Sequence, residues 1–164
     1  MRSILLALVT MLIFSCDQTK VASGKLSFIA TIDKWEKFRE LDILSVKTVL
    51  SNTTPDTITY VNMACSWEEA YTTDYKDLII FPSIIIFPGL CDTNAPVLIK
   101  IAPGESDARV LQLTSKKRID QLRNMKFRVG FKLIPAKDYD NLGDKASGLR
   151  ETKNVMWSNI LQMK

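Results

Sequence analysis

The clearest structural pattern in the chain is the stretch Lys126-Phe127-Arg128-Val129-Gly130-Phe131-Lys132-Leu133. Its apolar members stand at every second position, and the residues between them are charged or small. An extended segment with this period of two has one apolar face and one polar face. The stretch therefore predicts a β-strand with one buried face and one solvated face.

Comparable patterns recur through the rest of the chain. The alternation returns at Leu26–Ile32 and Leu44–Leu50. Runs rich in β-branched and aromatic residues follow at Thr57–Cys65, Leu78–Phe87, Val97–Ile101, Arg109–Leu113 and Val155–Leu161. Turn residues at Asn52–Asp56 and Pro103–Ser106 separate neighbouring strands.

A single segment, Ser115–Arg123, has a helical pattern, with Ser115 as its N-cap and Ile119 and Leu122 on one face. Short strands at regular spacing with one short helix are typical of a β-sandwich. We predict an all-β fold, an antiparallel immunoglobulin-like β-sandwich of about seven to nine strands.

The apolar run Leu78–Phe87 leaves two interpretations open. Pro82 interrupts it and cannot donate a hydrogen bond to a central strand ladder. The run is either an edge strand kinked at Pro82 that packs on the core, or an apolar patch that faces a partner.

The N-terminus has the features of an export signal. Arg2 precedes the apolar run Ile4–Phe14, which is too short to span a bilayer as a helix. The run ends in Ile13-Phe14-Ser15-Cys16, which resembles the lipobox of bacterial lipoproteins, although Phe14 departs from the usual small or β-branched residue.

The lipobox resemblance implies that Cys16 becomes the first residue, is diacylated with fatty acids such as palmitate, and is N-acylated. We therefore expect a lipoprotein signal peptide at 1–15, a flexible tether at 16–24 and the β-sandwich domain at 25–164. The expected location is the bacterial cell envelope, with the membrane contacted through lipid at Cys16. An ordinary secretory signal cleaved nearby and a buried apolar helix are the alternatives.

Two further cysteines, Cys65 and Cys91, remain after Cys16 is assigned to lipid. An exported compartment permits disulfides, so a bridge between this pair is the economical interpretation. Closing that loop would stabilise the fold by about 3.5 kcal/mol. A redox or metal pair is the alternative, but a Cys-x-x-Cys spacing is absent from the sequence.

Composition narrows the function. The 164 residues include no histidine, which excludes Ser-His-Asp and Cys-His catalysis and histidine metal ligands. The net charge of +4 is not gathered into a basic block, which argues against nucleic acid. We expect a protein that is not an enzyme and that needs no metal and no cofactor.

Two segments are candidate binding surfaces. The second choice is the aromatic segment that holds Trp67, Tyr71 and Tyr75, whose rings could bind a partner or pack beside the proposed bridge. The first choice is the long polar stretch Ala136–Lys153, in which we select Asp138, Tyr139 and Asp140. These two aspartates only partly match a calcium loop, because Leu149 stands where the bidentate glutamate belongs.

Adjacent carboxylates at Glu68 and Glu69 do not form an acid–base pair in an extended strand, and we expect both on a solvated connection. Two short modification patterns also occur. Asn52-Thr53-Thr54 matches the N-glycosylation triplet, and Asp56-Thr57-Ile58 resembles an O-glycosylation motif of some envelope bacteria.

The segments Leu50–Ile58 and Ile101–Ser106 are similar to the turn patterns of immunoglobulin-like envelope domains, among them the bacterial intracellular proteinase inhibitor type of sandwich. The resemblance supports a fold and says little about activity. We expect a non-catalytic envelope binding or accessory module that recognises a protein partner. A proteinase inhibitor and a glycan-binding domain are the alternatives.

Overall fold

The structure is a computed structural model that describes residues 25–82, 93–115, 117–137 and 154–163. These residues form eleven strands: β1 (Leu26–Phe38), β2 (Leu41–Asn52), β3 (Ile58–Met63), β4 (Tyr71–Thr73), β5 (Leu78–Phe81), β6 (Pro96–Ile101), β7 (Ser106–Ser115), β8 (Lys126–Phe127), β9 (Val129–Lys132), β10 (Val155–Trp157) and β11 (Leu161–Gln162). Every named pair of strands is antiparallel.

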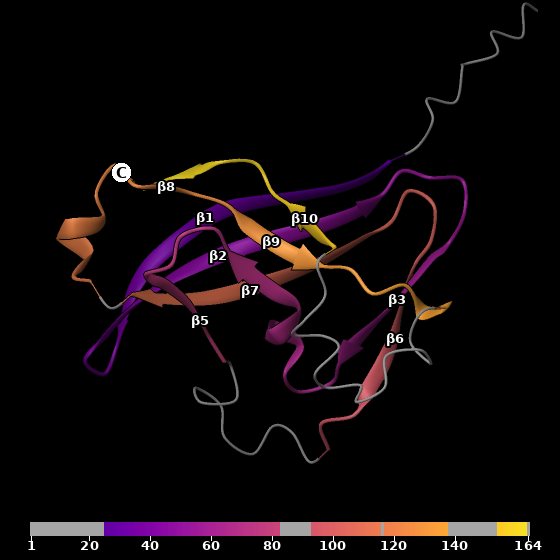
Figure 1. The fold of residues 1–164 in the computed structure, drawn as a ribbon, viewed down its shortest axis with the longest axis horizontal. Coiled ribbons are helices and arrows are strands. Elements are labelled where there is room, and N and C mark those ends of the chain that lie inside the picture. Colours follow the sequence, from indigo (N-terminus) through magenta and orange to yellow (C-terminus); the bar gives the residue numbers. More distant parts are fainter. Residues whose placement is uncertain (1–24, 83–92, 116, 138–153, 164) are drawn as a thin grey trace, which may run out of the picture.

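Two sheets form the body of the sandwich. One has the strand order β1-β2-β7-β5 and the other has the order β10-β9-β4, and β1, β2 and β7 run side by side in Figure 1. In chain order these seven strands follow the A-B-E-D and G-F-C arrangement of an immunoglobulin constant-type sandwich. The predicted all-β, immunoglobulin-like architecture is therefore confirmed.

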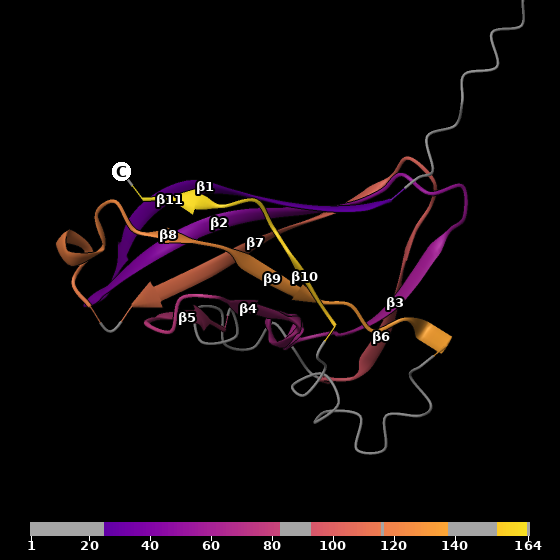
Figure 2. The same ribbon diagram turned by 45° about the horizontal axis from the view of Figure 1, so that its top comes forward.

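The remaining strands extend this framework. β3 pairs with β6 in a separate two-stranded ribbon at one end of the molecule (Figure 2). β8 pairs with β11. Along the chain, β8 directly precedes β9, and β10 directly precedes β11, so each of these two pairs forms one interrupted run. When these two interrupted runs are each counted once, the described residues contain nine strands, within the predicted range.

The core lies between the two main sheets. Phe127, Val129 and Phe131 are each no more than 2% exposed, which confirms the buried face predicted from the alternation. The ring of Phe131 lies 5.8 Å from that of Phe28 on β1, so residues of both sheets meet directly. Leu133, the last residue of the pattern, is half-buried.

β1 and β2 are longer than the sequence pattern predicts. The two strands pair from Leu26 to Phe38, but the register shifts between Ile32 and Lys34. This bulge inserts a residue and exchanges the two faces beyond it, so that Trp35 packs against the core. Because the alternation is interrupted there, the sequence pattern predicts a strand only as far as Ile32.

The predicted helix at Ser115–Arg123 is wrong in extent. Ser115 belongs to β7 and pairs with Leu78, and only a 3-10 turn, η2 (Ile119–Leu122), follows. Its N-cap residue is Arg118, which makes no capping bond through its side chain. Leu122, at the end of this turn, is buried. The strand ladder outweighs the weak helical pattern because β7 lies between two partner strands.

β5 is an edge strand and ends at Phe81, directly before Pro82. This confirms the edge-strand interpretation for the first part of the apolar run. Leu78 is buried against the core, whereas Ile79 is 41% exposed, as expected when successive side chains point to opposite faces. Residues 83–87 lie outside the described residues.

The two turn segments that carry the family resemblance contact each other. The Asn52 N–H donates to the Glu105 carbonyl at 2.9 Å, and the Gly104 N–H donates to the Asn52 carbonyl at 2.8 Å. Gly104 has a φ of 80°, which glycine adopts without steric cost. The turn after β2 and the turn before β7 therefore form one hydrogen-bonded unit.

Candidate functional site

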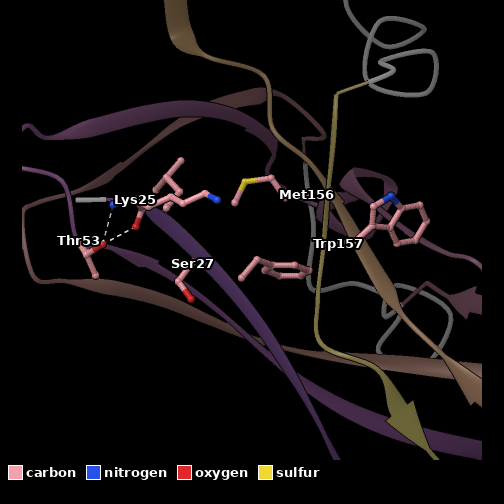
Figure 3. Close-up of a pocket in the computed structure, with 7 residues that line it drawn as sticks. Lys25, Ser27, Thr53, Met156 and Trp157 are labelled. Carbon is pink, nitrogen blue, oxygen red and sulfur yellow. Dashed lines mark hydrogen bonds between the residues drawn. The ribbon is translucent and has the colours of Figure 1, made fainter. Parts of the chain in front are cut away.

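An open groove of about 560 Å³ lies between the edge strands β1 and β10. Residues from the start of β1, from the turn after β2 and from β10 line it: Lys25, Leu26, Ser27, Phe28, Thr53, Met156 and Trp157 (Figure 3). Its volume is within the range of about 300–1,000 Å³ typical of ligand pockets. Lys25 is the only charged residue among those described here that line it.

The start of β1 is held in place by Thr53. The Lys25 N–H donates to Thr53 Oγ1 at 3.0 Å, and the same hydroxyl donates to the Lys25 carbonyl oxygen. Thr53 follows Asn52, whose side chain anchors the turn. The Lys25 side chain extends from this fixed point over the groove toward Met156 (Figure 3).

The edge of β1 opposite β2 directs backbone N–H and C=O groups into the groove. At the end of β2, the backbone of Asn52 bonds to residues 104 and 105, so it points away from its β1 partner Leu26. The Ala30 N–H likewise points away from β2, because it donates to Asn159 Oδ1 at 2.9 Å. In an antiparallel pair this orientation recurs at every second residue, so Leu26 and Phe28 also direct their N–H and C=O groups outward.

The free edge of β10 has the corresponding property. The Ser158 N–H donates to the Val129 carbonyl at 2.9 Å, so Ser158 and Val129 form a hydrogen-bonded pair. By the same alternation, Met156 bonds to β9, whereas Val155 and Trp157 direct their N–H and C=O groups away from β9. No backbone hydrogen bond between described residues joins β1 to β10.

Side chains make the groove floor apolar. Phe28 is 6% exposed, and Leu26 and Met156 pack against the core. Met156 points toward β1, whereas Trp157, the next residue, lies on the opposite side of β10 (Figure 3). The groove therefore combines apolar side chains, outward backbone groups and one lysine.

Trp157 is an aromatic residue beside the groove that the sequence patterns did not indicate, and its ring lies on the side of β10 away from β1. It pairs with Gly130, where an added Cβ would lie 2.9 Å from the indole and 2.5 Å from Val155 Cγ1. The Arg128 guanidinium lies 5.1 Å from the centre of the Trp157 ring. The Nε of Arg128 donates a hydrogen bond to Asp74 Oδ2 at 2.9 Å, which holds the guanidinium in place. Gly130 is the one feature of the sequence that could have indicated this contact, because a glycine within a strand often marks a place where another group approaches the backbone closely.

The aromatic residues that the sequence analysis selected do not form an exposed platform. Tyr71 is only 7% exposed, so its inclusion in a binding surface is wrong; as an inward-facing residue of β4, it contacts Phe131 in the core. Trp67 is half-buried, and its ring meets Tyr71 edge-on at 89°. Tyr75 is half-buried and accepts a hydrogen bond from Lys117 Nζ at 3.3 Å.

A polar cluster lies beside these rings. The Tyr60 hydroxyl donates to Asp107 Oδ2 at 2.8 Å, and Arg109 Nε donates to the same oxygen at 3.1 Å. The Arg109 guanidinium lies 5.6 Å from the Trp67 ring centre. Glu68 is 4% exposed in the 3-10 turn η1 (Trp67–Ala70), which corrects its predicted place on a solvated connection.

Buried tyrosines should make the protein less stable at alkaline pH. Burial raises the pKa of Tyr71 from 10.0 to about 12, and burial with the Asp107 bond raises the pKa of Tyr60. As the pH rises, the unfolded chain loses these hydroxyl protons before the folded chain does. The contribution of the two tyrosines to the free energy of unfolding is therefore fully present below pH 10 and falls as the pH rises toward 12. Urea unfolding over this range should show a shallower fall for Tyr71→Phe than for the unsubstituted protein.

Below about pH 9 the two proteins provide the control, since an ordinary tyrosine is neutral there and their stabilities should keep a constant difference. Equal slopes above pH 10 would contradict the prediction, because they would mean that Tyr71 titrates alike in the folded and unfolded chains.

Several predicted site residues lie outside the described residues: Cys16, Cys91, Asp138, Tyr139 and Asp140. Their assignments stay predictions. Cys65 is described and is buried just after β3.

The described residues contain neither a membrane-spanning helix nor a group of metal ligands. No helix there is long and apolar enough to cross a membrane. Within the same ranges, no group of three or more His, Cys, Asp or Glu residues could hold a metal ion.

Comparison with known proteins adds little to this description. No protein-family model matches the chain, and no curated protein matches it. Among solved structures, the chain is similar to the yjhA protein from Bacillus subtilis at 13% sequence identity, over 87% of this chain and 94% of that chain, with a TM-score of 0.38. A TM-score this low does not establish a common fold, so the architecture rests on the strand pairing of this chain.

Proposed function

We propose that this protein is a lipid-anchored, non-catalytic binding module of the bacterial cell envelope, and that it recognises a protein partner through the groove between β1 and β10. The observation that carries the proposal is the meeting, across an open and partly apolar groove, of two strand edges at which no described residue pairs with Leu26, Phe28, Val155 or Trp157 on the groove side. Edge strands are usually blunted or covered, because exposed edges pair with other chains. An edge kept open beside a fixed lysine fits a binding surface.

The groove chemistry suits a polypeptide. Outward N–H and C=O groups at Leu26 and Phe28 match the backbone of another chain, and the floor around Phe28 and Met156 accepts an apolar side chain. Lys25 adds a positive charge at the rim, which favours an acidic group on the partner.

The proposed anchor would place the groove close to a membrane. Lys25 follows Cys16 by nine positions, which span at most about 30 Å of extended chain. A partner bound at the groove would therefore itself lie near the lipid surface. Two or three acyl chains would hold the module there, since each buried CH₂ contributes about 0.8 kcal/mol.

The proposal retains the bridge between Cys65 and Cys91. Neighbours of Cys91 in the sequence lie beside Cys65, which supports it: the Cys65 Sγ is 3.2 Å from the Thr93 carbonyl oxygen, and the Cys65 N–H donates to Asn94 Oδ1 at 3.2 Å. Such a bridge would fasten the end of β3 to the segment before β6.

Crosslinking in the native envelope followed by affinity recovery tests the proposal. We expect the lipidated protein to recover a partner, and Cys16→Ser to recover much less and to be extracted without detergent. Lys25→Glu, which reverses the charge at the groove, should lower recovery several-fold. The matched control is Lys100→Glu, at a lysine that is also exposed and lies on β6 in the β3-β6 ribbon.

Each arm has a contradicting outcome. Equal recovery with Lys25→Glu and Lys100→Glu would show that the groove is not the binding surface. Equal extraction of the lipidated protein and Cys16→Ser without detergent would show that Cys16 is not the anchor. Stoichiometric loss of endopeptidase activity on adding the protein would instead favour the inhibitor alternative.

A further inference from the structure

We infer that the partner binds as an extended peptide that adds to the groove as a β-strand, antiparallel to both β1 and β10. The inference rests on the proposed function and specifies its mode of recognition. It replaces a general docking surface by a defined hydrogen-bonding pattern, in which main-chain bonds supply affinity and alternate side chains supply specificity.

The first step concerns the hydrogen bonds that β1 offers. Leu26 and Phe28 direct one N–H and one C=O each toward the groove, at the two-residue spacing that an added antiparallel strand requires. At the next such position, Ala30, the N–H already donates to an amide oxygen, that of Asn159. Among the described residues, the edge of β1 is therefore satisfied by an amide at Ala30 and open at Leu26 and Phe28, which line the groove.

The second step concerns the direction of the added strand. Residues 25–28 share the groove with Met156 and Trp157, and Ala30 bonds to Asn159, so β1 and β10 advance in the same direction. Figure 3 shows both strands bordering the groove. A peptide antiparallel to β1 is then also antiparallel to β10, whose outward groups are at Val155 and Trp157.

The third step concerns side chains. Successive residues of an added strand point to opposite faces, so alternate residues would meet the apolar floor made by Leu26, Phe28 and Met156. A residue near the start of β1 would meet the Lys25 ammonium, the only charge among the described groove residues. The expected ligand alternates apolar and polar residues and has an acidic side chain or a terminal carboxylate at one end.

Selection from a random dodecapeptide phage library on the immobilised full chain tests this mode. Enriched peptides should show the apolar–polar alternation with an acidic residue. Leu26→Ala is the reference variant: it keeps the outward N–H but shortens one side chain of the apolar floor, so the peptides should bind it somewhat more weakly than the unsubstituted protein. Leu26→Pro removes that N–H at the first residue of β1, a position where proline is tolerated. It should weaken binding roughly tenfold relative to Leu26→Ala, the effect of about 1.4 kcal/mol.

Amide hydrogen exchange on the unsubstituted protein gives a second measurement that does not depend on the folding of a variant. A bound peptide should slow exchange at the N–H groups of Leu26, Phe28, Val155 and Trp157. The Ser27 N–H is the internal control, because it points toward β2 and should not change.

The outcomes separate the two proposals. Enriched peptides that bind Leu26→Pro and Leu26→Ala equally, or that leave exchange at Leu26 and Phe28 unchanged, would overturn strand addition while the groove remains the binding surface. Enrichment of no peptide would also overturn it. Failure of Lys25→Glu to lower partner recovery would instead reject the groove itself.

Discussion

Phe131→Ala should lower the free energy of unfolding by roughly 3–5 kcal/mol, the range for truncating a buried phenylalanine. The Phe131 side chain is 1% exposed, and its ring centre lies 5.0 Å from Tyr71, 5.4 Å from Tyr60 and 5.8 Å from Phe28. Truncation therefore leaves a cavity between the two main sheets and removes three ring contacts. Urea unfolding, with a transition midpoint shifted to lower denaturant, measures the loss.

Leu98→Ala is the matched control for this truncation. Leu98 is 58% exposed on β6, so its replacement should change stability by no more than about 0.5 kcal/mol. If Phe131→Ala cost as little as this control, Phe131 could not be the centre of the core. Native proteins are stable by only about 5–15 kcal/mol, so the expected loss is a large part of the total.

Asn52→Ala should lower the free energy of unfolding by about 3 kcal/mol, because it removes several hydrogen bonds of one buried side chain at once. Asn52 is fully buried, and its Nδ2 donates to the carbonyl oxygens of Asp56 at 2.8 Å and Ile101 at 2.9 Å. Its Oδ1 accepts bonds from the Thr54 N–H at 2.9 Å and the Thr54 hydroxyl at 2.6 Å. Thermal and urea unfolding measure the effect.

Asn52→Asp separates the loss of the donor from the loss of shape. This variant keeps the oxygen that Thr54 contacts but places a carboxylate oxygen against the carbonyls of Asp56 and Ile101. It should be at least as unstable as Asn52→Ala at neutral pH. A stable Asn52→Asp protein would show that the bonds to these carbonyls contribute little.

The role of Asn52 shows how a sequence pattern can carry a structural reason. Asn52-Thr53-Thr54 matches a glycosylation triplet, but the Asn52 amide is buried and occupied by hydrogen bonds in the folded protein. The same asparagine ties the turn after β2 to the turn before β7. The two turn motifs are far apart in the sequence. They match the pattern of an immunoglobulin-like fold because the two turns contact each other in that fold.

Side-chain period and turn chemistry predicted the strands, since both depend on neighbours within a few residues. The alternation at Phe127, Val129 and Phe131 identified the buried face of one strand correctly. The same reasoning missed the extension of β1, because the bulge after Ile32 exchanges the faces of the strand. It also predicted a helix where Ser115 pairs with Leu78 in a ladder that the local pattern does not reveal.

The candidate site was not predicted, because its parts come from opposite ends of the chain. Leu26 begins β1 and Lys25 directly precedes it, whereas Met156 and Trp157 belong to β10, more than a hundred residues later. Nothing in either segment shows that they face each other. The aromatic cluster was chosen from sequence proximity, but Tyr71 turned inward because β4 packs on the core.

The sequence by itself determined an all-β, immunoglobulin-like chain, because period-two alternation and turn residues are local properties that the backbone obeys wherever it lies. Only the tertiary structure decided which edges stay unpaired, which rings are buried and which residues share a groove. Those features depend on strand order and register, and these are set by packing between segments more than a hundred residues apart, such as the bond from Ala30 to Asn159.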